Sequence, residues 1–242
     1  MKDKILKGIA VNTIINKLFF VDVLVVVLHI LWGDKTYLFN MDWERNIPTM
    51  YQSFKMVFAG GIIFCVWLLY KFLKEEKNRK LLSFWLGTSI LVILMGFDEG
   101  AELHENVPNY FREIIPDFSR WYENIFSSLG FESSIWIVYV LFFFLPIVVV
   151  WLIYIFPEVW KVYGKRVYPL ILAVIVFFAG ALGMEFVSTI GEIWHSSWYE
   201  VTMVIEEFLE MLGGTIFMYF GLQELSFAVR KVKEKIMFQL ID

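Results

Sequence analysis

The uncharged apolar stretches of the sequence constrain the fold more than any other feature. Residues 133–157 contain no Asp, Glu, Lys or Arg over 25 positions, and residues 167–184 contain none over 18. A helix that crosses the hydrocarbon core of a membrane needs roughly 20 mainly apolar residues. The chain is also 59% apolar and 19% charged, against about 45–50% and about 25% in ordinary soluble domains. A polytopic membrane protein is therefore predicted.

Shorter uncharged runs at 56–70 and 81–97, with two apolar segments near the chain ends, bring the expected helices to six. They span about 12–32, 50–71, 81–104, 134–156, 168–195 and 200–228. We expect an all-α, six-transmembrane-helix bundle that forms a single domain over residues 1–242. Its basic start resembles a signal peptide, but Asp22 and His29 interrupt the apolar stretch, so we expect an uncleaved first helix.

The basic residues predict the orientation, because Lys and Arg favour cytoplasmic loops. With both termini cytoplasmic, 15 of the 21 bases fall on the cytoplasmic side and 5 on the opposite side. Residues 106–132, between the third and fourth helices, carry aromatic side chains at roughly helical spacing, interrupted by Pro108 and Pro116. One or two helices in the membrane interface fit this pattern, serving as an aromatic belt or as a lid.

Charge and cysteine content exclude several classes of function. A net charge of −4 does not provide the basic surface that nucleic acid requires. The single cysteine, Cys65, excludes a disulfide framework and cysteine-based zinc or iron–sulfur sites. The expected location is the cell membrane, with membrane lipid as one partner and a second copy or a membrane complex as another.

The third helix ends in a run of acidic residues. On a helical wheel, three of them share one stripe and two other polar residues flank it. The stripe is Asp98, Glu102 and Glu105, and the flanking residues are Glu99 and His104. Gly96 and Gly100 form a GxxxG pair on the same helix, which permits close approach of a neighbouring helix.

The fifth and sixth helices carry a second acidic group. The fifth has Glu185, Ser188, Glu192 and His195 on one face, and the sixth opens with Glu206, Glu207 and Glu210. Glu192 and His195 have the Glu-x-x-His spacing of di-metal helix bundles. If the turn lies near residues 197–198, Glu192 matches Glu206 in depth and Glu185 matches Glu210. Asp22 and His29 on the first helix, with Ser188, are secondary candidates.

So many carboxylates cannot all ionise side by side in a low dielectric. Lys55 and Arg112 are the nearest bases, and this topology puts both at the rim of the acidic region. The compensating charge is therefore expected to come from a metal ion or from protons, and not from a salt bridge.

We expect a carboxylate and histidine metal site, possibly dinuclear, in the outer, extracytoplasmic half of the bundle. The candidate ligands are Asp98, Glu99, Glu102, His104, Glu105, Glu185, Glu192, His195, Glu206, Glu207 and Glu210. Such ligands suit divalent iron, manganese or zinc. The site could oxidise or hydroxylate a lipophilic substrate or hydrolyse a lipid. Whether the protein is an enzyme stays open.

Two alternatives remain beside the metal site. The protein could be a proton- or cation-coupled transporter, since membrane carboxylates often relay protons. The acids stop at the outer half, however, and a pathway through the membrane should leave polar groups on both sides. The protein could also be a non-catalytic subunit of a membrane complex.

Two motifs resemble those of poorly characterised prokaryotic multi-pass membrane proteins. They are FDEGAELHE at 97–105 and EEFLEMLGG at 206–214, which resemble a DE…HE stretch and an E-x-L-E-M-L-G stretch. The resemblance implies no activity, but it implies one site formed by Asp98, Glu99, His104, Glu105, Glu207 and Glu210. The helical wheel separates Glu99 and His104 from the stripe, and a helix break near Gly100 would reconcile the two.

Overall fold

The computed structural model describes residues 2–43, 45–73, 78–127, 136, 139, 142, 144–184, 186–187 and 198–239. Every regular element within these ranges is helical, so the all-α prediction is confirmed for them. The elements are α1 (Lys2–Trp32), the short turns η1 (Gly33–Lys35) and η2 (Tyr37–Phe39), α2 (Ile47–Leu73), α3 (Arg79–Ala101), α4 (Leu103–Ile114), α5 (Pro116–Ser127), α7 (Leu145–Tyr163), η4 (Gly164–Val167), α8 (Tyr168–Phe178), the π-helical η5 (Ala179–Met184) and α10 (Tyr199–Gln239).

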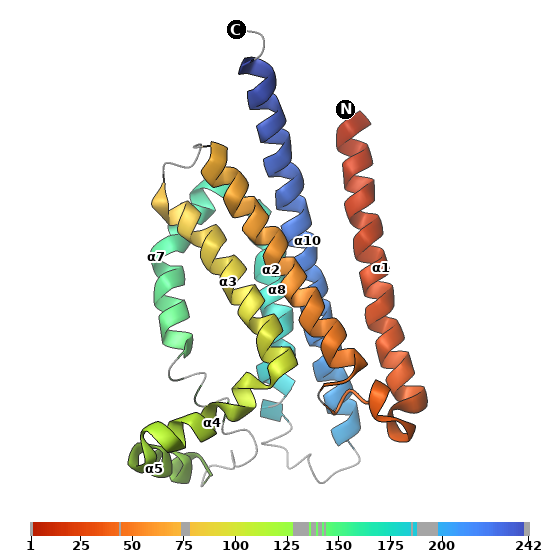
Figure 1. The fold of residues 1–242 in the computed structure, drawn as a ribbon, viewed down its shortest axis with the longest axis vertical. Helices are drawn as coiled ribbons and strands as arrows, with labels where there is room; N and C mark the ends of the chain where they lie inside the picture. Colours follow the sequence, from red (N-terminus) through yellow and green to blue (C-terminus); the bar gives the residue numbers. More distant parts are fainter. Residues whose placement is uncertain are drawn as a thin grey trace.

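The long helices form a bundle with both chain ends at one end and α4 and α5 at the other (Figure 1). We call these the terminal end and the α4–α5 end. In the interior, α2 packs against α3 and α10, and α10 packs against α8. α1 lies at the edge of the bundle and packs mainly against α10.

Four stretches are long and apolar enough to cross a membrane: Ala10–Trp32, Ile47–Phe72, Arg79–Ala101 and Leu145–Met184. The fourth contains α7 and α8, which run in opposite directions (Figure 1). The reversal lies at Gly164, whose φ of 50° suits a residue without a Cβ. α10 is longer than any of these but carries several glutamates, and it is not one of the four.

The third helix ends earlier in the structure than the sequence predicted. The expected helix ran to residue 104, but α3 ends at Ala101 because Glu102 is left-handed, with φ 53°. Pro116 begins α5, as its fixed φ and missing N–H favour. Pro108 lies inside α4, so the expectation of a break there was wrong.

Other helix bounds also differ from those expected. α1 begins at Lys2 and α10 continues to Gln239, each well beyond its apolar core. The expected helix 168–195 begins as α8, which ends at Phe178, and continues as the π-helical η5 to Met184. Residues 185 and 188–195 of that expected helix lie outside the described residues. The expected helix 134–156 corresponds to α7, which is described from Leu145 and extends to Tyr163.

Two glycines of α3 allow this helix to approach α2 closely. A Cβ on Gly96 of α3 would lie 2.8 Å from the Val57 backbone nitrogen and 2.9 Å from the Ser53 carbonyl oxygen, both on α2. A Cβ on Gly100 would lie 2.7 Å from Ser53 Oγ. The predicted GxxxG contact is therefore present, and α2 is its partner.

We expect Gly96→Ala to destabilise the bundle by about 1–3 kcal/mol, because the added methyl overpacks against backbone atoms that cannot move aside. Gly61→Ala is the matched control, since its Cβ would meet nothing within 4 Å and alanine favours a helix by about 0.5–1 kcal/mol. Thermal unfolding of both variants in detergent, followed by circular dichroism, measures the difference. Equal midpoints would contradict the close α2–α3 contact.

Candidate functional site

Asp22 of α1 is fully buried at the centre of a network that joins three helices. Its Oδ1 atom lies 2.7 Å from Lys55 Nζ and accepts a hydrogen bond of 2.6 Å from the Tyr51 hydroxyl, both on α2. Its Oδ2 atom accepts a hydrogen bond of 2.6 Å from Thr215 Oγ1 on α10. The carboxylate is thus held by a cation and two hydroxyls.

Lys55 is 4% exposed and is the cationic half of this pair. Its ammonium also donates to the Met211 carbonyl at 2.8 Å and lies 4.5 Å from the Tyr51 ring centroid. Gly214 makes room for it, because a Cβ there would lie 3.0 Å from Lys55 Cε. A larger residue at this position of α10 would therefore require the Lys55 side chain to shift.

Gln52 is a second α2 side chain that lies close to Gly214, and its polar atoms lack hydrogen-bond partners within the described ranges. Its Oε1 would lie 3.2 Å from a Cβ on Gly214. The side chain is 1% exposed, and neither amide atom has a hydrogen-bond partner within the described ranges. Leaving a buried polar group unpaired costs roughly 1–3 kcal/mol, so this amide adds to the cost of burying polar groups beside the ion pair.

These contacts correct the expected compensation of charge. Lys55 does not lie at the rim, and a salt bridge neutralises Asp22. Arg112 pairs with Glu123 of α5 at 2.9 Å, so it does not serve the acids of α3. An ion pair inside a membrane bundle is costly to bury, and such groups usually mark a functional site.

The break after α3 brings together two of the expected site residues. Asp98 accepts a hydrogen bond of 2.8 Å from the His104 backbone N–H, and its Oδ2 lies 3.1 Å from His104 Nδ1. On an unbroken helix these side chains would point apart. The break lies two residues beyond Gly100, and it brings Asp98 and His104 into contact.

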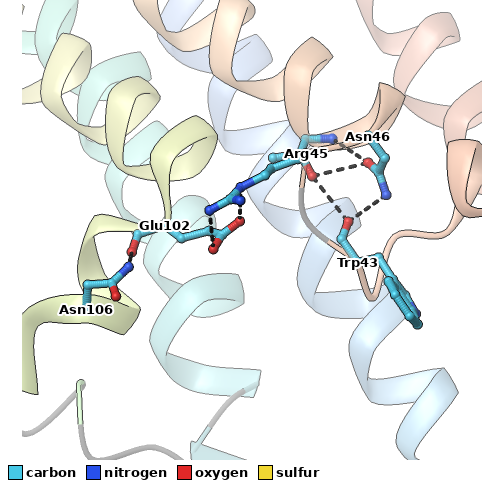
Figure 2. Close-up of polar contacts among 6 residues, drawn as sticks. Trp43, Arg45, Asn46, Glu102 and Asn106 are labelled. Atoms are coloured by element: carbon cyan, nitrogen blue, oxygen red, sulfur yellow. Dashed lines mark hydrogen bonds and ion pairs between the residues drawn. The ribbon is translucent and has the colours of Figure 1, made fainter. Parts of the chain in front are cut away.

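Glu102, at the break itself, pairs with Arg45 (Figure 2). The Arg45 guanidinium contacts both carboxylate oxygens, at 2.8 Å and 3.2 Å. Arg45 has φ 60°, and within the described ranges these two are the only residues other than glycine with positive φ. The ion pair therefore links two strained backbone positions, one between α1 and α2 and one between α3 and α4.

The remaining candidates are spread over the α4–α5 end. Glu206, Glu207 and Glu210 lie on α10, and Glu210 is 8% exposed. A Cβ on Gly180 would lie 2.9 Å from Glu210 Cγ, so η5 packs beside this glutamate. His29 accepts a hydrogen bond of 3.1 Å from the Met41 backbone N–H. Outside the described residues are Glu185, Ser188, Glu192 and His195, together with the side chain of Glu105.

Aromatic side chains of α4 and α5 gather around Tyr139, whose ring centroid lies 4.8 Å from that of Phe111 on α4 and 5.0 Å from that of Tyr122 on α5. Tyr122 stacks on Phe118 with ring centroids 5.5 Å apart, and it is 3% exposed. Burial, with Tyr139 nearby, raises the pKa of Tyr122 to about 12. This hydroxyl therefore stays protonated at neutral pH and acts as a packing group.

The sequence analysis missed Tyr51, Gln52, Lys55 and Thr215. Three of these residues lie on α2. Lys55 follows Gln52 by three residues and Tyr51 by four, so the three side chains share one face of the helix. That polar face in an apolar helix was the available signal. It was overlooked because Lys55 was placed at the rim of the bundle.

Replacing Asp22 by Asn should lower the free energy of unfolding by about 3–5 kcal/mol, because Lys55 is left buried without a partner. Lys55→Met should cost a similar amount, whereas the double variant should recover most of the loss. Thermal unfolding in detergent gives the three values. Asp117→Asn is the control, since the Asp117 side chain is 97% exposed; additive losses in the double variant would contradict the pairing.

Comparison with known proteins gives a family without an assigned activity. No group of three or more His, Cys, Asp or Glu suited to a metal occurs in the part of the chain that the structure describes. Neither a curated protein nor a solved structure matches the sequence. A family model described as a domain of unknown function (DUF8692) matches residues 17–223. The chain therefore belongs to the DUF8692 family.

Proposed function

We propose that this protein is an ion-coupled membrane transporter and that Asp22 and Lys55 form its coupling site. The observation that carries the proposal is the depth of the pair. Asp22 lies twelve residues from Ala10 and ten from Trp32, at the middle of the apolar stretch of α1. Coupling ions in many transporters bind near the middle of the membrane.

The ion pair between Asp22 and Lys55 can exist in two states, with Asp22 either charged or protonated, as coupling to an ion requires. Protonation of Asp22 removes the negative charge that holds the Lys55 ammonium, so an arriving proton would break the contact between α1 and α2. Thr215 and the Met211 carbonyl attach the same pair to α10. A change at one carboxyl group would thus alter the packing of three helices.

Polar contacts lie toward both ends of the bundle and not only near the acids of the α4–α5 end. Their presence in both halves supports transport against the argument that the acids stop at the outer half. Toward the α4–α5 end lie Asp98 and His104. Toward the terminal end, Arg166 pairs with Glu224, which is 3% exposed. Trp85 donates a hydrogen bond of 2.8 Å to Tyr163 in the same half.

The finer topology belongs to this proposal. We place six spans across the membrane, with α7, α8 and α10 as the last three and both termini in the cytoplasm. The α4–α5 end then lies on the extracytoplasmic side. The hairpin of α7 and α8 and the position of both chain ends support this arrangement (Figure 1).

We expect the internal pH of proteoliposomes that contain the intact protein to change when a pH gradient or an alkali-cation gradient is imposed. Asp22→Asn should reduce this flux at least about tenfold, because the coupling carboxylate is lost. A pH-sensitive dye trapped inside the vesicles measures the flux. Asp117→Asn, the same chemical change at an exposed position, should leave it unchanged.

The double variant Asp22→Asn with Lys55→Met separates loss of function from loss of fold. It is neutral at the site and is expected to fold, so its flux should be absent in a stable protein. Flux in this variant, or its absence from the unaltered protein under every gradient, would overturn the proposal.

A second candidate is the metal-dependent membrane enzyme that the sequence indicated, acting on a lipid or lipophilic substrate. The observation in its favour is the contact between Asp98 Oδ2 and His104 Nδ1. A carboxylate bound to one imidazole nitrogen orients the other nitrogen for a metal. Iron, manganese or zinc would suit such a site, with the α10 glutamates supplying oxygen ligands.

Elemental analysis of the purified protein tests this candidate. If the protein is a metal enzyme, we expect close to one or two divalent metal ions per chain. The metal should be lost in His104→Ala, in Glu192→Ala and in Glu210→Ala. Asp117→Asn should keep the metal, because that exposed carboxylate is not one of the candidate ligands. Metal-free protein that still drives ion flux would exclude the enzyme and leave the transporter.

A further inference from the structure

An apolar groove of about 650 Å³ lies between α1, α8 and α10. Ile15 of α1, Leu172 and Ile175 of α8, and Ile216 of α10 line it. Ile175 is 60% exposed, which is high for a side chain that faces neighbouring helices. The groove thus leaves apolar surface uncovered between three helices.

The groove exists because α1 packs poorly against the bundle. Only 11% of the residues in its apolar window are buried, against 39% for α2 and for α3. Both α1 and α8 belong to stretches long and apolar enough to cross a membrane. At that depth, the molecules available to fill such a groove are lipids.

Polar groups lie at the end of the groove nearest the terminal end. Asn12 of α1 and Tyr168 of α8 line it there. Lys165 is exposed and precedes Tyr168 by three residues. Arg166 is held by Glu224, whereas Lys165 has no ion-pair partner within the described ranges. Two hydrogen-bonding side chains therefore line this end of the groove, and an exposed cation lies three residues before one of them along the chain.

We infer that this groove binds one anionic phospholipid of the surrounding membrane. One acyl chain lies along Ile15, Leu172 and Ile175, and the phosphate group lies at Asn12, Tyr168 and Lys165. Lipid tails are as apolar as the groove, so the acyl chain gives no preference among lipids. Selectivity for negative charge comes from Lys165, since a basic residue at the surface attracts anionic lipid. The inference does not depend on the proposed transport.

The test uses the full chain reconstituted in vesicles of equal parts phosphatidylcholine and phosphatidylglycerol with the same acyl chains. Native mass spectrometry after extraction counts the lipids that remain bound. We expect one retained lipid per chain, with phosphatidylglycerol enriched about fivefold over phosphatidylcholine, the factor expected for one basic residue.

Two variants with matched controls locate the site. Ile175→Trp should fill the groove and abolish retention, whereas Ile153→Trp, on α7 and 69% exposed, should not. Lys165→Gln should remove the preference for phosphatidylglycerol without preventing retention, whereas Lys161→Gln should keep it. Equal melting temperatures of the four variants show that folding is unaffected.

Three results would overturn the inference. The first is retention that Ile175→Trp leaves unchanged, because the lipid would then lie elsewhere. The second is equal retention of both lipids by the unaltered protein, which would leave Lys165 without a role. The third is a dimer that Ile175→Trp dissociates, because a second copy would then occupy the groove.

Discussion

The buried ion pair between Asp22 and Lys55 is the interaction on which the arrangement of the bundle depends. Each charge alone would be too costly to keep in an apolar interior, so each fixes the position of the other. Thr215 and the Met211 carbonyl then hold α10 against the same point. Three helices are thereby set in one relative position.

Small residues allow this arrangement. Gly214 leaves room for the Lys55 side chain, and Gly96 lets α3 approach the backbone of α2. The close approach of α3 brings its carboxyl-terminal end, with Asp98, toward the helices that carry the pair. The left-handed Glu102 then turns the chain into α4, and Arg45 holds that turn from the α1–α2 connection.

Several parts of the site could be predicted from local spacing. The GxxxG pair at Gly96 and Gly100 indicated close packing, and the motif resemblance grouped Asp98 with His104. The helical wheel failed for those two, because it assumed a continuous helix through Glu102. Lys55 was misplaced for a different reason. The sequence of an apolar helix indicates how deep each residue lies in the membrane, but it does not indicate which neighbouring helix the polar face contacts.

The sequence by itself determined the helical class of the described ranges and the presence of stretches long and apolar enough to cross a membrane, because long uncharged apolar runs have few other stable environments. It also showed that acidic residues are concentrated at certain helix ends. Only the tertiary structure decided which charges meet. The partner of Asp22 lies 33 residues away on another helix, and that pairing depends on packing between helices, which periodicity along one helix does not record.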